Sequence, residues 1–119
     1  MQVVDPKRLQ LWQALSEFFL DTELTDRTIA YIARVIQETG YSYQDVHTIL
    51  WGEVFPVLKS NMICVAGEWA GWPDEWLLKR LRVRTGPVKK PGGFIAAEID
   101  KCWQRVLAQL PPGFAGAAQ

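Results

Sequence analysis

Histidine and cysteine are scarce in this chain. Its 119 residues include one histidine, His47, and two cysteines, Cys64 and Cys102. A zinc site or a histidine-based catalytic group normally draws on several such residues at defined spacings, and this sequence has neither a second histidine nor paired cysteines. Its serines also lack the G-x-S-x-G setting of a hydrolase nucleophile. We therefore predict no bound metal, no cofactor and no nucleophilic catalytic residue.

Long apolar runs are absent as well. The run Phe18–Leu20 is short and is followed at once by charged residues, whereas a membrane-spanning helix needs roughly 20 apolar residues. The N-terminus has no charged-then-apolar leader, and the two isolated cysteines are typical of free thiols. We expect a cytoplasmic protein with no membrane partner.

Helical periodicity and helix-end residues divide the chain into helices. Asp5-Pro6 predicts the start of a helix over 6–20, and Gly40 the end of one over 26–39. Ser42 predicts the start of a third helix, which Pro56 should kink or end. Further helices are expected over 61–65, 73–83 and 94–110.

No strand-like alternation competes with these helical patterns. The predicted fold class is therefore all-α, a compact single-domain bundle of five to six helices. We expect the domain to span residues 1–110, with a flexible tail at 111–119.

The net charge of zero hides an uneven distribution. Residues 1–75 carry eleven acids and five bases, and the remainder carries eight bases and two acids. The folded chain either neutralises itself or presents two functional faces of opposite sign. The basic half contains a run without an acid, formed by Lys79, Arg80, Arg82, Arg84, Lys89 and Lys90. This run could contact phosphates, although the zero net charge and the lack of a nucleic-acid-binding motif disfavour that use.

Glu53 is predicted to lie on the apolar face of the third helix. A carboxylate there must be neutral, paired or hydrogen-bonded, and the favoured interpretation is a structural bond to an arginine or a tryptophan indole inside the core. The alternative is a tryptophan-lined pocket of a small enzyme or ligand-binding protein, in which Glu53 acts with Glu68 and His47. The favoured interpretation of His47 is a hydrogen-bonded residue at the edge of the core.

Tryptophan is abundant, with six residues, four of them between positions 51 and 76. Trp51 is predicted to lie in the core. The later three flank a glycine and proline turn, where partly exposed rings could anchor a partner. Together with nearby acids they form the predicted partner-binding set, which is Asp21, Glu23, Asp26, Glu68, Trp69, Trp72 and Trp76.

Several motifs resemble those of a family of small bacterial proteins known as a domain of unknown function. They are Leu11-Trp12, Leu15-Ser16, residues 19–24 (FLDTEL), Trp51, Glu53, residues 56–58 (PVL), Asn61 and residues 66–71 (AGEWAG). The resemblance covers about residues 9–81. It implies a compact bacterial cytosolic protein and supplies no activity. In size and style the chain is also similar to immunity proteins that neutralise a toxin encoded nearby.

The leading functional hypothesis is a non-enzymatic module that binds a protein partner, in the form of an immunity-type inhibitor of a bacterial effector toxin. Acids near Asp26 would steer a basic toxin, and the exposed tryptophans would anchor it. The alternatives are the Glu53 pocket of an enzyme or ligand-binding protein and nucleic-acid binding through Lys79–Lys90.

Overall fold

The computed structural model describes residues 4–19, 24–64, 73–84, 88–111 and 114. Within these ranges the chain forms helices and no strand, which confirms the predicted all-α class. In chain order the elements are α1 (Pro6–Ser16), the 3-10 turn η1 (Glu17–Phe19), α2 (Asp26–Thr39), α3 (Tyr43–Thr48), the π-helix η2 (Ile49–Val54), α4 (Phe55–Cys64), α5 (Asp74–Arg80) and α6 (Phe94–Gln109).

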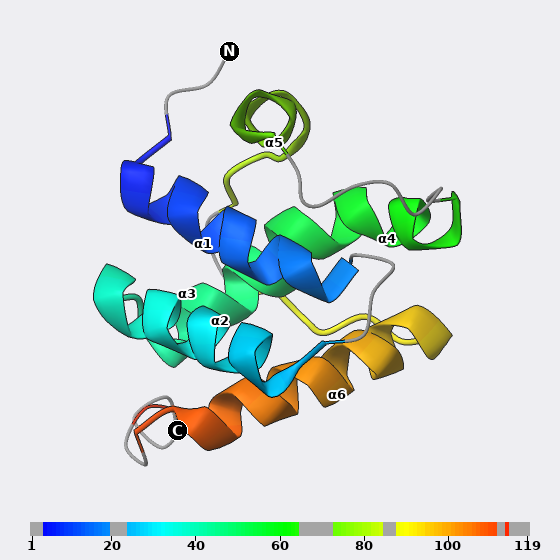
Figure 1. Ribbon diagram of the computed structural model, residues 1–119. Coiled ribbons are helices and arrows are strands. Elements are labelled where there is room, and N and C mark those ends of the chain that lie inside the picture. Colours follow the sequence, from blue (N-terminus) through cyan, green and yellow to red (C-terminus); the bar gives the residue numbers. More distant parts are fainter. Residues whose placement is uncertain (1–3, 20–23, 65–72, 85–87, 112–113, 115–119) are drawn as a thin grey trace.

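The helices pack around α1 and α2 (Figure 1). α1 contacts α2, α5 and η2, and α2 in turn contacts α6. α5 and α2 lie on opposite sides of α1. The elements α3, η2 and α4 follow one another without a break and run behind α1, so η2 lies in the interior of the protein.

Short polar side chains and one glycine fix the helix ends. Asp5 caps α1 by accepting a hydrogen bond from the Lys7 amide at 2.8 Å, and Ser42 caps α3 by accepting one from the Asp45 amide at 3.1 Å. Gly40 ends α2 with a φ of 77°, a left-handed conformation that glycine adopts at little cost. These three predicted ends are confirmed.

One core is formed by apolar stripes from all the long helices. In α2 the apolar residues Ile29, Ile32, Ala33 and Ile36, which repeat at helical spacing, are all buried. Trp51 is 2% exposed, as predicted for a core residue, and lies with its ring centroid 5.3 Å from that of Phe55. The core therefore follows the sequence periodicity closely.

Of the two outcomes expected at Pro56, a kink or an end, the end of the third helix does not occur. The helix widens into a π-helix one turn earlier, and the Phe55 amide bonds the carbonyl of Leu50, five residues back. Pro56 then falls in the first turn of α4, which continues through Asn61 to Cys64. The prediction of a separate helix beginning at Asn61 was therefore wrong. The wider turn accommodates a residue that has no amide hydrogen and whose ring crowds the preceding turn.

Three other expectations need correction. The 6–20 helix is α-helical only as far as Ser16, with η1 after it, and α5 covers Asp74–Arg80 rather than 73–83. The helix expected over 94–110 does not bury its first apolar residue, since Phe94 at the start of α6 is 77% exposed. Beyond α6, Phe114 lies edge-on to Tyr43 with centroids 6.0 Å apart, and a flexible tail over 111–119 stays a prediction.

A connecting segment, described over residues 81–84 and 88–93, joins α5 to α6 and passes close to η2. Gly52 permits this approach, because a Cβ atom there would lie 2.9 Å from Val88 Cγ2. None of the described helices has the length and apolarity required to cross a membrane.

Candidate functional site

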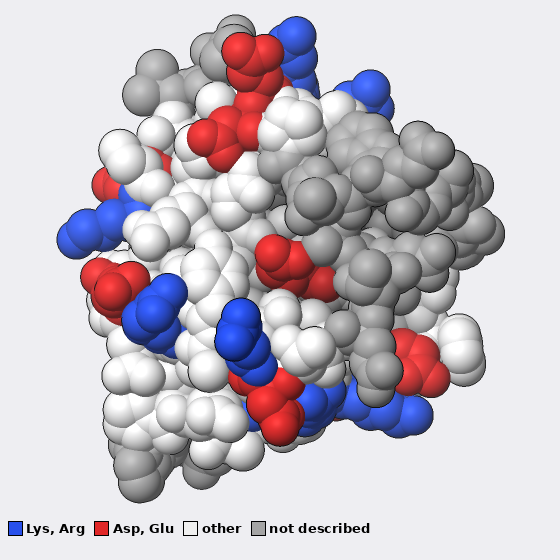
Figure 2. Space-filling model, viewed as in Figure 1, with Lys and Arg blue, Asp and Glu red and all other residues white. Residues whose placement is uncertain are grey.

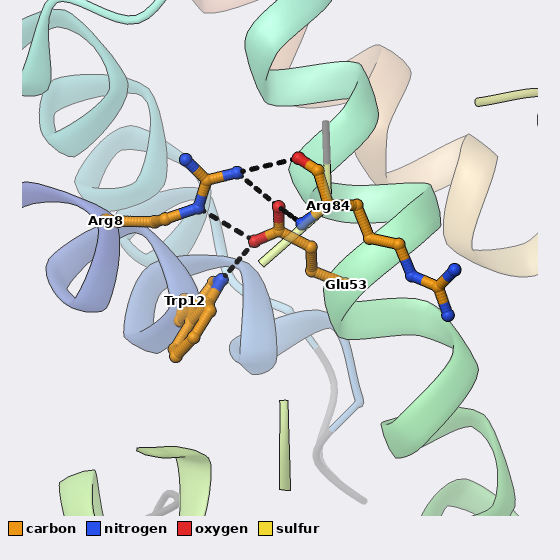
Figure 3. A network of polar contacts seen from close by, with 4 residues as sticks. All are labelled: Arg8, Trp12, Glu53 and Arg84. Atoms are coloured by element: carbon orange, nitrogen blue, oxygen red, sulfur yellow. Dashed lines mark hydrogen bonds and ion pairs between the residues drawn. The ribbon is translucent and has the colours of Figure 1, made fainter. Parts of the chain in front are cut away.

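The carboxylate of Glu53 is buried and accepts hydrogen bonds on both oxygens. Its side chain has no exposed surface. Glu53 Oε1 accepts hydrogen bonds from Arg8 Nε at 3.0 Å and from Trp12 Nε1 at 2.8 Å. Glu53 Oε2 accepts one from Arg84 N at 2.9 Å and forms an ion pair with Arg8. Each carboxylate oxygen therefore has two donors (Figure 3).

Each donor comes from a defined place in the fold. Arg8 and Trp12 lie four residues apart, so they project from the same face of α1 toward η2. Arg84 takes part through its backbone, since its amide donates to Glu53 and its carbonyl oxygen accepts from Arg8 Nη2 at 3.4 Å, and its side chain points away from the carboxylate (Figure 3). Glu53 thus joins α1, η2 and the connecting segment at one point.

The ion pair also affects the arginine. The hydrogen bond to Glu53 raises the pKa of Arg8 above its ordinary value, against the opposing effect of burial. Arg8 is therefore a permanent cation, and the interior holds a fully paired charge rather than an uncompensated one. This is the arginine and indole bonding predicted for a structural Glu53.

His47 contacts the same connecting segment farther along. Its Nε2 lies 2.8 Å from the carbonyl oxygen of Val88, so the N–H on Nε2 donates this bond. Glu53 and His47 therefore hold the two described parts of the segment, at Arg84 and at Val88. Glu68, the third residue of the alternative pocket, lies outside the described residues, as do Asp21, Glu23, Trp69 and Trp72.

The two described members of the predicted partner-binding set lie apart. Asp26 is at the start of α2, where its exposed carboxylate forms an ion pair with Arg105 at 3.1 Å. Trp76 is half-buried on α5 and has the Arg80 guanidinium carbon 5.1 Å from its ring centroid. Since α1 separates α2 from α5, the structure does not bring these two residues together.

The acidic and basic halves pair with each other sparingly. Among the described residues one ion pair joins them, Arg105 with Asp26. Arg8 pairs with Glu53 inside the acidic half, and Lys90 and Lys101 pair with Asp100 and Glu98 inside the basic half. Figure 2 shows acidic and basic side chains intermixed in small groups on the face in view. These ion pairs do not show the acidic and basic halves fully neutralising each other.

One surface cavity, of about 650 Å³, lies between η1 and α2. Glu17, Arg27, Thr28, Tyr31 and Arg34 contribute to its walls, and the Arg34 guanidinium carbon lies 5.8 Å from the centroid of the Tyr31 ring. Burial raises the pKa of the Glu17 carboxyl, and burial followed by the Glu17 charge raises that of Tyr31.

A second cavity, of about 480 Å³, lies between α4 and the start of α6. We call it the α4–α6 groove; it is lined by Phe55, Lys59 and residues 91–96. The sequence interpretation missed both cavities because neither carries a recognisable motif. The phenylalanine that follows the Pro91-Gly92-Gly93 stretch was the signal available for the second one.

The remaining reactive groups form no cluster. Burial raises the pKa of the Cys102 thiol, which disfavours the nucleophilic thiolate. The described part of the chain contains no group of three or more histidine, cysteine or acidic side chains placed to hold a metal ion. The indole nitrogen of Trp103 is buried without a hydrogen-bond partner, and its ring stacks against Tyr43.

The fold and this site define a small all-helical domain organised around a buried, fully bonded carboxylate. The chain belongs to the family described as a domain of unknown function, DUF7079, whose model matches residues 6–110. The match extends the sequence resemblance, placed at residues 9–81, through α6. It provides no activity and no link to immunity proteins. No curated protein and no solved structure matches the chain.

Glu53→Gln tests the structural role of the carboxylate. Glutamine preserves the shape but removes the charge, and its amide nitrogen would face donors in place of an acceptor. We expect a loss of about 3–5 kcal/mol in the free energy of unfolding, measured by urea denaturation.

Glu98→Gln is the matched control, since it removes an exposed ion pair and should change stability by less than about 1 kcal/mol. Equal stability of the two variants would show that Glu53 is not a structural residue.

Glu17→Gln tests the pH dependence of stability. Because the folded state raises the pKa of Glu17, its contribution to stability is present below its ordinary pKa and is lost as pH rises through the raised value. Glutamine never ionises, so the variant should be more stable than wild type in urea at pH 7, with the difference shrinking below about pH 4. Glu38→Gln on α2 controls for the loss of one charge, and a pH-independent difference would contradict the assignment.

Proposed function

We propose that this protein is a non-enzymatic module that binds another protein. The observation that supports this best is the exposed aromatic ring of Phe94 at the rim of the α4–α6 groove. Among the described residues the exposed large apolar side chains are Phe94 and Val83. Protein interfaces are anchored by such aromatic residues beside apolar pockets.

The bonding of Glu53 favours this function over an enzyme. A catalytic carboxylate must reach a substrate, but both oxygens of Glu53 are occupied by protein donors and the side chain is fully buried. The two cavities described above, among the described residues, are not lined by Glu53 or His47. Glu53, on which the enzyme alternative depends, therefore bonds other parts of the protein instead of a substrate.

In its more specific form, the proposal is an immunity-type inhibitor in a bacterial cytoplasm, which docks on an effector toxin encoded nearby and blocks its active site. The side chain of Asp26 is 98% exposed despite its ion pair with Arg105. With Asp21 and Glu23 it would attract a basic toxin over a distance, an effect that raises association rates more than it strengthens the final complex.

Co-expression with the products of neighbouring genes tests this function. We expect one product to arrest growth, this protein to restore growth, and the two to co-purify as a stoichiometric complex. The triple variant Asp21→Asn, Glu23→Gln, Asp26→Asn should slow association about 10-fold at low salt, whereas Glu38→Gln should not. A protein that rescues growth from no neighbouring product and forms no complex with any would contradict the proposal.

A further inference from the structure

The α4–α6 groove has a rigid floor. Phe55, which is 4% exposed, forms this floor and is held by two aromatic neighbours. Its ring centroid lies 5.3 Å from that of Trp51 and 6.2 Å from that of Phe19. A floor fixed in this way is already shaped for a ligand, so binding costs little conformational entropy.

The walls of the groove are apolar and partly open. Pro91 and Ile95 are partly buried, and Ala96 is buried. Gly92 and Gly93 have no atom within 4 Å of the position that a Cβ would take, so their side of the groove is open. Phe94 stands beside this opening and is 77% exposed. An apolar side chain entering the groove would cover Phe94 and contact Phe55.

The charge that lines the groove is positive. Lys59 is its single charged lining residue, and the Lys59 ammonium lies 5.7 Å from the centroid of the Phe55 ring. No acid occurs between Glu75 and Glu98, a stretch that includes Lys89, Lys90 and the α6 side of the groove. Among these bases, Lys90 forms an ion pair, with Asp100, in the described structure. The lining of the groove, through Lys59, is therefore complementary to negative charge.

We infer that the α4–α6 groove binds an acidic segment of a protein partner, with one apolar side chain seated on Phe55 and Phe94 and a neighbouring carboxylate facing Lys59. This inference rests on the proposed binding function and adds the chemistry of the partner. The basic run predicted from the sequence then has a role beyond solubility, since Lys89 and Lys90 lead directly into the groove at Pro91.

A protein segment fits this site better than a nucleic acid does. An exposed ring and lysines could also stack on and pair with a single strand. However, the groove is a pocket of about 480 Å³ whose lining includes the buried Phe55 ring, and the side chains of an extended segment can occupy such a volume whereas a flat base stacked on Phe94 leaves it empty.

Selection from a library of random short peptides displayed on phage tests the inference with the full-length protein. We expect enriched peptides to combine a large apolar residue with Asp or Glu close by. A fluorescently labelled synthetic copy should bind at least about 10-fold more weakly to Phe94→Ser and to Lys59→Glu, the size of effect expected of central contact residues.

Val83→Ser controls for loss of an exposed apolar side chain, and Lys7→Glu for charge reversal at an exposed lysine away from the groove. Both should bind the peptide as wild type does, and circular dichroism should show all four variants folded.

Four results would overturn the inference. They are enrichment of basic peptides, no enrichment of any peptide, peptide binding that Phe94→Ser and Lys59→Glu leave unchanged, and a dimer in light scattering that depends on Phe94. The dimer would assign the groove to a second copy of the chain. Salt-sensitive binding of a single-stranded oligonucleotide that Phe94→Ser abolishes would assign it to nucleic acid instead. In each case rescue from a toxin by the wild-type protein can still be observed, so the two proposals fail separately.

Discussion

A buried charge must be paired or hydrogen-bonded inside the protein, and here that requirement applies to the Glu53 carboxylate. An isolated carboxylate in an apolar interior would cost several kcal/mol. Hydrogen bonds from a guanidinium and an indole of α1 and from a backbone amide of the connecting segment offset this cost. Satisfying the carboxylate therefore fixes how α1 crosses η2 and where the chain runs after α5.

The connecting segment links this interior constraint to the surface. It is held at Arg84 by Glu53 and at Val88 by His47, and Gly52 leaves room for Val88 to pack against η2. From Val88 the chain passes Lys89 and Lys90 and enters the groove wall at Pro91. The position of the proposed partner site thus depends on contacts that are themselves buried.

The sequence predicted the helical class, several helix ends and most of the core, because caps and apolar periodicity act over a few residues. It also predicted that Glu53 would bond an arginine or an indole. It could not predict the Arg84 amide as a donor, since that contact joins residues 31 positions apart and involves no side-chain signal. The π-helix depends on a one-residue change of hydrogen-bond register before Pro56, and the exposure of Phe94 depends on where α6 begins. Neither is encoded in periodicity.

Hydrogen exchange at the Arg84 amide, followed by NMR, tests the central claim most directly. This amide lies outside any helix, and its acceptor is the buried Glu53 carboxylate. If the carboxylate joins the three segments, the amide should exchange only when the protein unfolds, with a protection free energy within about 1 kcal/mol of the global stability. Exchange at the rate of an unprotected amide would show that Glu53 does not hold the connecting segment and would contradict the account.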